Sequence, residues 1–229
     1  MIKKHIPNTI TCCNLISGCI ATLYAFEANF DMALLFIIIG AVFDFFDGMS
    51  ARLLGVSSPI GKELDSLADD ITFGFAPSAI VFSYLRPETE LLPFLVFVMA
   101  AFSALRLAKF NLDERQALGF IGLPTPANAL FWGSLIAGAG EWMKTAPFIG
   151  DNLSLVILAG VFISCYLLIA EIPMFALKFK HWGWKGNEIK YVFVLSCVPL
   201  LLLLGVSGFA AIIAWYVVLS EFANVTKKK

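Results

Sequence analysis

Long apolar runs separated by short charged segments form the pattern of this chain. A helix that crosses a bilayer needs about 20 mostly apolar residues. We predict membrane-spanning helices at eight segments of about that length: 8–26, 31–54, 64–85, 91–111, 122–141, 153–177, 189–205 and 208–225. The last two come from one uncharged stretch, in which Gly205, Ser207 and Gly208 predict a turn. Because the runs are continuous and do not alternate, the pattern indicates an all-α helix bundle and not a β-barrel.

The composition agrees with a protein embedded among membrane lipids. Apolar residues make up 59% of the chain and charged residues 14%, against about 45–50% and about 25% in soluble proteins. A soluble domain of this size would have to expose large apolar patches. The net charge of −1 provides no basic surface, so nucleic acid is excluded as a partner.

The basic residues predict the orientation in the membrane. Eight crossings place both termini on one side. If that side is the cytoplasm, Arg86 and Lys144 lie outside and the other 14 of the 16 Lys and Arg residues lie inside. This asymmetry follows the positive-inside rule, so we expect both termini to be cytoplasmic.

Four carboxylates interrupt the second and third predicted spans. Asp44 and Asp47 are three residues apart, and Asp65 and Asp69 are four apart, so each pair lies on one face of its helix. A charged carboxylate inside a span costs at least about 2.5 kcal/mol. Because a short loop joins the two spans, we expect the pairs to face each other at the cytoplasmic ends of antiparallel helices.

Converging carboxylates need a counter-charge. Two divalent cations would supply it, and oxygen ligands favour Mg²⁺, Mn²⁺ or Ca²⁺ over zinc. The alternative is a set of structural ion pairs with Arg52 and Lys62. One arginine and one lysine carry too little positive charge to neutralise four carboxylates. Small residues at Gly48, Ala51 and Gly61 fit either close helix packing or a flat floor for a ligand beside the metals.

Residues 44–69 read D-F-F-D-G-M-S-A-R, then eight residues, then G-K-E-L-D-S-L-A-D. This resembles the signature of the CDP-alcohol phosphotransferase family, D-x2-D-G-x2-A-R-x8-G-x3-D-x3-D. The eight fixed positions all match: Asp44, Asp47, Gly48, Ala51, Arg52, Gly61, Asp65 and Asp69. Four further stretches are similar to the bacterial phosphatidylserine synthase branch of that family: I-P-N-T-I-T near the start, Gly61 to Ser78, R-L-A-K-F-N from Arg106 and G-L-P-T-P-A from Gly122.

The resemblance implies transfer of the phosphatidyl group of CDP-diacylglycerol to L-serine, with release of CMP. It implies that Asp44, Asp47, Asp65 and Asp69 hold two divalent cations, Mg²⁺ or Mn²⁺ with Ca²⁺ as a further candidate. Arg52 would hold phosphate oxygens, Gly48, Ala51 and Gly61 would admit the cytidine, and Asp69 would be the base. No fixed position of the signature is Ser, Cys or His, so direct attack is simplest, and a phosphatidyl-enzyme stays open.

The resemblance also implies a location and an organisation. We expect the bacterial inner (cytoplasmic) membrane, with the active site on the cytoplasmic side, and a homodimer. We expect one integral membrane domain over residues 1–229. Within it, a catalytic core covers about 6–178 and two extra helices cover about 189–225.

L-serine carries a carboxylate that needs a cation. Arg106 lies near the cytoplasmic end of the fourth predicted span, with Lys109 one turn on and Asn111 beside them. These three residues are our candidates for binding serine. The alternative is that the side chains of Arg106 and Lys109 extend toward lipid headgroups.

Three polar residues recur at helical spacing in the first predicted span: Asn8, Thr11 and Asn14. They can reach the cytidine, or they can form hydrogen bonds between helices. Glu171 lies within the sixth predicted span, where its surroundings, whether bundle, cavity or rim, stay open.

Two other functions are alternatives for a membrane protein with clustered carboxylates. A sister enzyme of the same family would use glycerol 3-phosphate or an inositol phosphate as acceptor, and would want an additional cationic pocket. A divalent-cation transporter would place its carboxylates near the midplane and would show a repeat. Here the carboxylates lie toward one face, and residues 110–229 contain no second copy of the motif.

Overall fold

The structure is a computed structural model that describes residues 5–113, 120–175, 183–184 and 186–227. The first half contains α1 (His5–Phe26), α2 (Phe30–Leu54), α3 (Pro59–Asp69), the π-helix η2 (Asp70–Phe75), α4 (Ala76–Leu85), the 3₁₀ helix η3 (Leu92–Phe97) and α5 (Val98–Leu112). The second half contains β1 (Phe120–Ile121), α6 (Thr125–Thr145), the 3₁₀ turn η5 (Gly150–Asn152), α7 (Leu153–Ile169), β2 (Pro173–Met174), α8 (Glu188–Leu204), the 3₁₀ turn η6 (Gly205–Ser207) and α9 (Gly208–Lys227).

The described part of the chain is an all-α membrane bundle apart from the short strand pair. Each of the eight predicted ranges contains a helix. Five helical segments are long and apolar enough to cross a membrane: His5–Phe26, Phe30–Leu54, Leu92–Leu112, Gly150–Ile169 and Glu188–Val225. The last of these contains the η6 turn. The segment from Pro59 to Leu85 is less apolar because it carries the aspartates, so the number of crossings stays a prediction.

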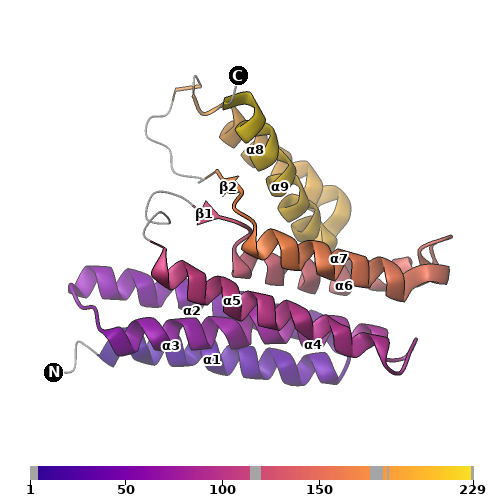
Figure 1. Cartoon of the computed structure of the whole chain (residues 1–229), viewed down its shortest axis with the longest axis horizontal. Coiled ribbons are helices and arrows are strands. Elements are labelled where there is room, and N and C mark those ends of the chain that lie inside the picture. Colours follow the sequence, from indigo (N-terminus) through magenta and orange to yellow (C-terminus); the bar gives the residue numbers. More distant parts are fainter. Residues whose placement is uncertain (1–4, 114–119, 176–182, 185, 228–229) are drawn as a thin grey trace.

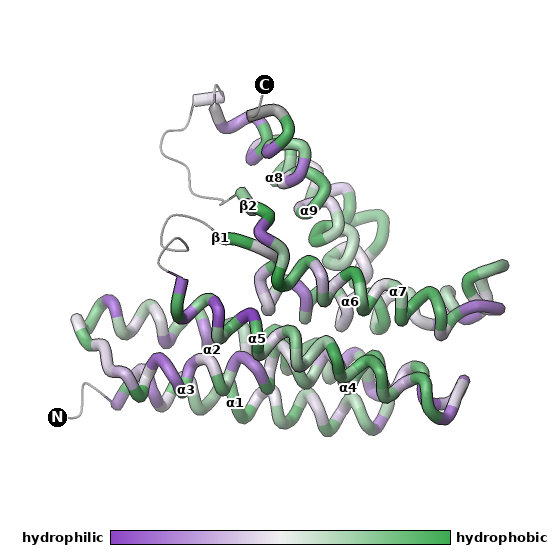
Figure 2. The backbone as a smooth tube through the Cα atoms, viewed as in Figure 1, coloured by the Kyte–Doolittle hydropathy of each residue, from purple (hydrophilic) through white to green (hydrophobic). Residues whose placement is uncertain are grey.

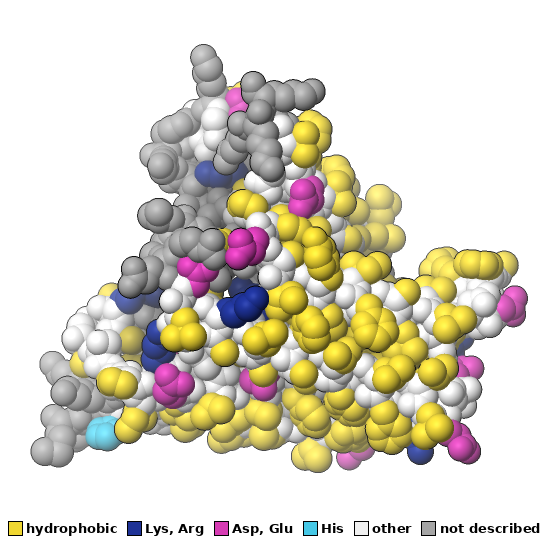
Figure 3. All heavy atoms as spheres, viewed as in Figure 1, with side chains coloured by type: hydrophobic (Ala, Val, Ile, Leu, Met, Phe, Trp, Pro, Cys, Tyr) yellow, Lys and Arg dark blue, Asp and Glu magenta, His cyan; other side chains and the backbone are white. Residues whose placement is uncertain are grey.

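The helices form two layers and an inclined pair. Figure 1 shows α1 to α5 side by side along the long axis, with α6 and α7 in a second layer and the α8–α9 pair inclined to both. Between the layers lie buried side chains such as Phe73, Tyr84, Met99 and Trp132. Figure 2 shows hydrophilic residues concentrated at helix ends and around α3. In Figure 3 a hydrophobic surface covers most of the length between the two ends, as a lipid-facing protein requires.

One close junction joins α1, α2 and η2 just above the aspartates. A Cβ atom on Gly18 would lie 2.7 Å from the Cα of Thr72, and one on Gly40 would overlap the Thr72 methyl group. The Thr72 hydroxyl donates a hydrogen bond to the backbone oxygen of Asn14 at 3.0 Å. These glycines therefore let three helices meet, which fixes where η2 begins and where Asp69 lies.

The sixth predicted span, 153–177, was too long. The helix α7 ends at Ile169, and Ala170 is extended, because Pro173 offers no backbone N–H and disfavours helix before it. The chain continues as β2, which pairs antiparallel with β1 through Phe120 with Met174 and Ile121 with Pro173. No feature of the sequence predicts this pair, and Glu171, which the predicted span places in a helix, lies after the end of α7. Residues 176–177 of the predicted span lie outside the described part.

The turn predicted between the last two helices is confirmed. Gly205 has a φ of +56° and starts η6, which ends at Ser207. This turn packs against Gly138 in the middle of α6, where a Cβ atom would lie 2.9 Å from the Cα of Ser207. The α8–α9 pair is therefore anchored on α6 by its turn.

Candidate metal and nucleotide site

Three of the four predicted ligands converge. One carboxylate oxygen each from Asp44 and Asp47 on α2 and from Asp65 on α3 lie within 4.8 Å of one another. A sharp turn makes this convergence, because Gly55 caps α2 with a φ of +61°. Ser58 then starts α3 by accepting a hydrogen bond from the Gly61 N–H at 3.0 Å.

Asp69 lies one helical turn beyond Asp65, in a more buried place. It is 9% exposed, and its charge interacts with the charges of Asp44, Asp65 and Asp47. Its carboxylate is outside the group of three oxygens that lie within 4.8 Å. The structure thus brings the four aspartates to one region, with the oxygens of three clustered and the fourth, Asp69, one turn away and buried like Asp47.

Two polar side chains of α1 hold these carboxylates. The Thr11 hydroxyl donates to Asp47 Oδ2 at 2.6 Å, and Asn14 Nδ2 donates to Asp69 Oδ1 at 3.0 Å. Both donors are buried, at 3% and 0% exposure. Of the two interpretations of the polar residues in the first span, hydrogen bonding between helices is confirmed for Thr11 and Asn14.

The ion-pair interpretation of the aspartates is wrong for the described residues. None of the four carboxylates forms an ion pair with a Lys or Arg within that part of the chain, although the charge of Arg106 interacts with that of Asp69. Lys62 instead donates through Nζ to the backbone oxygen of Asn111 at 2.8 Å. A cluster of carboxylate oxygens without a protein counter-charge fits hard divalent cations, whose preferred ligands are oxygens.

A pocket of about 270 Å³ opens beside the clustered carboxylates. Asp47 and Asp65 line it, together with the small residues Gly48, Ala51 and Gly61. A Cβ atom on Gly48 would meet only Arg52, at 3.6 Å from Nη1, so a larger side chain there would extend into the pocket. Of the two interpretations of these small residues, their position in the pocket favours the floor.

The sequence analysis missed part of this pocket. The turn between α2 and α3 lines it through Val56, Ser57 and Ser58, and α1 lines it through Pro7 and Asn8. The Ser58-Pro59 pair was a readable signal, because Ser at the N-cap and Pro at the first position mark the start of a helix. Arg52 is exposed at the end of α2 and is not among the lining residues.

Two of the three candidates for binding serine share a second pocket, of about 380 Å³. Arg106 and Lys109 line it, and Arg106 is 6% exposed. The Arg106 Nε has no hydrogen-bond partner among the described residues. Asn111 lies elsewhere: its Nδ2 donates to Ser66 Oγ at 2.7 Å, so it ties α5 to α3.

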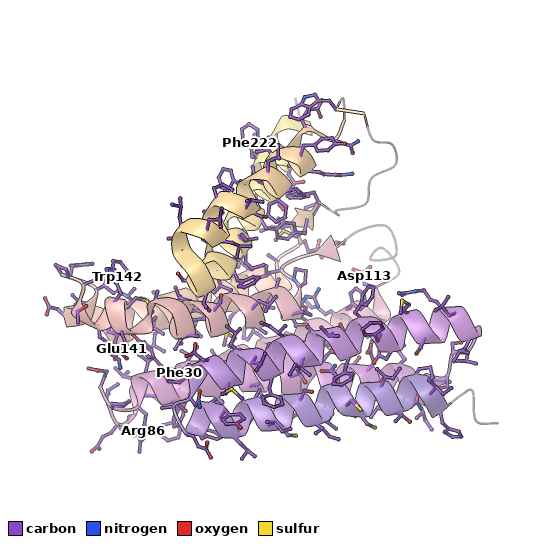
Figure 4. All side chains as sticks on the ribbon, turned by 180° about the vertical axis from the view of Figure 1, so that it is seen from behind. Phe30, Arg86, Asp113, Glu141, Trp142 and Phe222 are labelled. Carbon is purple, nitrogen blue, oxygen red and sulfur yellow. The ribbon has the colours of Figure 1, made fainter. Side chains whose placement is uncertain are left out.

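The two ends of the bundle differ in character. Figure 4 shows Asp113 at the end of α5 near the strand pair, and Arg86, Glu141 and Trp142 at the opposite end. The candidate sites therefore lie at the end that the basic residues predict to be cytoplasmic.

Comparisons with known proteins show the family of this chain. A sequence model of the CDP-alcohol phosphatidyltransferase family matches residues 4–222.

Three relatives carry the name CDP-diacylglycerol–serine O-phosphatidyltransferase. The protein from Bacillus subtilis is 42% identical over 126 residues, which are 54% of this chain and 70% of the relative. The protein from Methanocaldococcus jannaschii is 31% identical over 205 residues, 90% of this chain and 86% of the relative. The protein from Helicobacter pylori strain 26695 is 29% identical over 191 residues, 82% and 79%. The chain therefore belongs to the CDP-alcohol phosphatidyltransferase family.

Proposed function

We propose that this chain transfers the phosphatidyl group of CDP-diacylglycerol to L-serine, which yields phosphatidylserine and CMP. Membership of the family and the name that its relatives share support this proposal. The observation that carries it is the convergence of Asp44, Asp47 and Asp65 beside the 270 Å³ pocket. That arrangement fits a pyrophosphate at the carboxylates with its nucleoside on the adjacent floor.

Each residue of the signature takes a role in this proposal. The cytidine lies on Gly48, Ala51 and Gly61, where the absence of larger side chains leaves room. Arg52, whose guanidinium lies near Gly48, holds phosphate oxygens through its planar fork. Four aspartates hold two divalent cations, Mg²⁺ or Mn²⁺: Asp44, Asp47, Asp65 and Asp69. Such cations, when bound, neutralise the carboxylates and polarise the pyrophosphate.

The reaction balances with one proton transfer. The hydroxyl oxygen of serine forms a bond to the phosphatidyl phosphorus. The bond from that phosphorus to the bridging oxygen breaks, and CMP leaves with the electron pair. Asp69 takes the hydroxyl proton, and Asn14 keeps its carboxylate oriented.

The setting of this reaction is also proposed. The chain lies in the bacterial cytoplasmic membrane with its termini and active site on the cytoplasmic side. It forms one membrane domain, with a catalytic core at about 6–178 and two extra helices at about 189–225. A homodimer follows from the family resemblance, and the mass of the protein in lipid nanodiscs tests it.

The test is CMP release by detergent-purified protein given CDP-diacylglycerol. The acceptor is L-serine, glycerol 3-phosphate or none, and the metal is Mg²⁺, Mn²⁺, Ca²⁺ or none with EDTA. We expect release that requires both L-serine and Mg²⁺ or Mn²⁺. Release with glycerol 3-phosphate alone would retain the family and refute serine as the acceptor.

A variant separates chemistry from binding in the same assay. Asp69→Asn keeps the size and one hydrogen-bonding oxygen but removes the base. We expect turnover to fall by a factor of about 100 or more, while binding of CDP-diacylglycerol stays measurable. Near-normal turnover in this variant would remove Asp69 as the base.

A further inference from the structure

We propose that the 380 Å³ pocket between the ends of α5 and α7 binds the zwitterionic head of the amino-acid acceptor, with Arg106 and Lys109 on its carboxylate and Glu171 on its ammonium. This inference rests on the proposed function and adds Glu171 as a residue that determines acceptor specificity. No residue of the family signature lies in this pocket.

The charges in the pocket match a zwitterion. Its lining includes two cations, Arg106 and Lys109, and two carboxylates, Asp113 and Glu171; the remaining lining residues are apolar. The formal charge of this set is zero, with both signs present. A phosphorylated acceptor would bring an extra negative charge close to the two carboxylates of the pocket. An amino acid instead offers its carboxylate to the two cations and its ammonium to the two carboxylates. Figure 3 shows side chains of both signs around a hollow beside the strand pair.

Arg106 is a buried cation with unused hydrogen-bonding capacity. Its side chain is 6% exposed, yet its Nε has no partner among the described residues. Burying an unpaired guanidinium is costly, and a group left unsatisfied in this way indicates an absent ligand or water. A carboxylate from the acceptor would satisfy it through a charge-assisted hydrogen bond.

The strand pair fixes Glu171 at this pocket. The Gly122 N–H donates to the Ile172 oxygen at 2.9 Å, and the Leu123 N–H donates to the Leu167 oxygen at 2.8 Å. Gly122 has a φ of +75°, and a Cβ atom there would lie 2.9 Å from the oxygens of Ala170 and Leu168. The G-L-P-T-P-A stretch therefore holds the end of α7 and the residues on both sides of Glu171, which gives this stretch a role in the site.

Arg106 also connects the pocket to the proposed base. Gly74 packs against Ser103, and Asn111 bonds to Ser66, so α5 runs antiparallel to α3 and η2. One turn from Ser103, Arg106 lies alongside the start of η2, and its charge interacts with Asp69. An acceptor held by Arg106 therefore lies on the side of α5 from which its hydroxyl can reach Asp69.

The test compares Glu171→Gln with Glu221→Gln, the same substitution at an exposed residue of α9. Both proteins are assayed for CMP release with L-serine varied and CDP-diacylglycerol varied. The second ligand is 3-hydroxypropionate, which keeps the hydroxyl and carboxylate of serine but lacks the ammonium. Its inhibition constant against L-serine is measured for each protein.

We expect Glu171→Gln to raise the KM for L-serine about ten-fold or more, because a charged hydrogen bond is lost. The KM for CDP-diacylglycerol should change less than two-fold, and the inhibition constant of 3-hydroxypropionate should not rise. Glu221→Gln should match the unaltered protein in all three constants.

Three outcomes would overturn the proposal. An unchanged serine KM in Glu171→Gln refutes it while leaving serine transfer intact. A parallel rise in the 3-hydroxypropionate constant would show a distorted pocket and no contact with the ammonium. Release of CMP by the unaltered protein with glycerol 3-phosphate but not with L-serine would refute the proposed function and this inference together.

Discussion

Carboxylates that bind metal need more than the right spacing, because each must also point in the right direction. Thr11 and Asn14 on α1 supply that orientation, through hydrogen bonds to Asp47 and Asp69. Each donor is buried against its carboxylate, where competing water is excluded. Residues of this kind are often nearly as important as the ligands that they orient.

At this scale we predict the effect of Thr11→Val, which keeps the shape and removes the hydroxyl. The concentration of Mn²⁺ that gives half-maximal CMP release should rise about ten-fold or more, because Asp47 loses its donor. Thr9→Val is the matched control, since the Thr9 hydroxyl bonds only to the backbone of its own helix at His5. Equal metal requirements in the two variants would contradict a role for Thr11 in the metal site.

At the scale of elements, α1 is the support on which the site is built. It packs against α2, α3 and η2, and these elements carry the four aspartates or follow directly from them. The glycine junction at Thr72 lets the three segments approach closely, and Thr72 lies within the π-helix, which begins at Asp70. π-helical turns are uncommon and often lie at functional sites, which agrees with the position of Asp69 directly before η2.

We predict that Gly18→Ala destabilises the protein. Its Cβ would lie 2.7 Å from the Thr72 Cα, so α1 and η2 must separate, at a cost of about 1–3 kcal/mol. The midpoint of thermal unfolding in detergent should fall by about 5 °C.

Gly48→Ala is the control for that measurement, because its Cβ would lie at an ordinary distance of 3.6 Å from Arg52 Nη1. Its unfolding midpoint should stay within about 1 °C of that of the unaltered protein. If both variants unfold at the same temperature, the junction at Thr72 is not a rigid contact.

At the scale of the whole molecule, charge and apolar surface are separated along the helices. The proposed chemistry lies at one end, and Arg86, Glu141 and Trp142 lie at the other. The α8–α9 pair meets the rest through α6 and through β2, and it carries exposed apolar residues over much of its length. This distribution fits a bundle whose reaction takes place at one membrane surface.

The orientation can be measured with reporter fusions. Green fluorescent protein fused after Lys229 should fluoresce, and alkaline phosphatase fused there should be inactive, because we expect a cytoplasmic C-terminus. Alkaline phosphatase fused after Ala146, in the segment between α6 and η5, should be active. Active phosphatase after Lys229 would refute the proposed orientation, and fusions after Val56 provide a cytoplasmic reference.

The presence of each helix, the membrane setting, the family and the identity of the aspartates could all be predicted from the sequence. Each of these depends on local information: the length of an apolar run, the turn at Gly205, or the spacing of Asp44, Asp47, Asp65 and Asp69. The helical spacing of Asn8, Thr11 and Asn14 also singled out these polar residues of the first span, but it did not predict their hydrogen-bond partners.

Which distant groups meet became known from the folded structure. The bond from Thr11 to Asp47, the end of α7 at Ile169 and the position of Glu171 beside Arg106 depend on contacts between segments far apart in the chain. An apolar run predicts a helix but not the residue where it stops when a distant segment, here Leu123 just after β1, bonds to one of its last carbonyl oxygens. Composition and spacing carry no information about such pairings, because close packing of whole helices sets them.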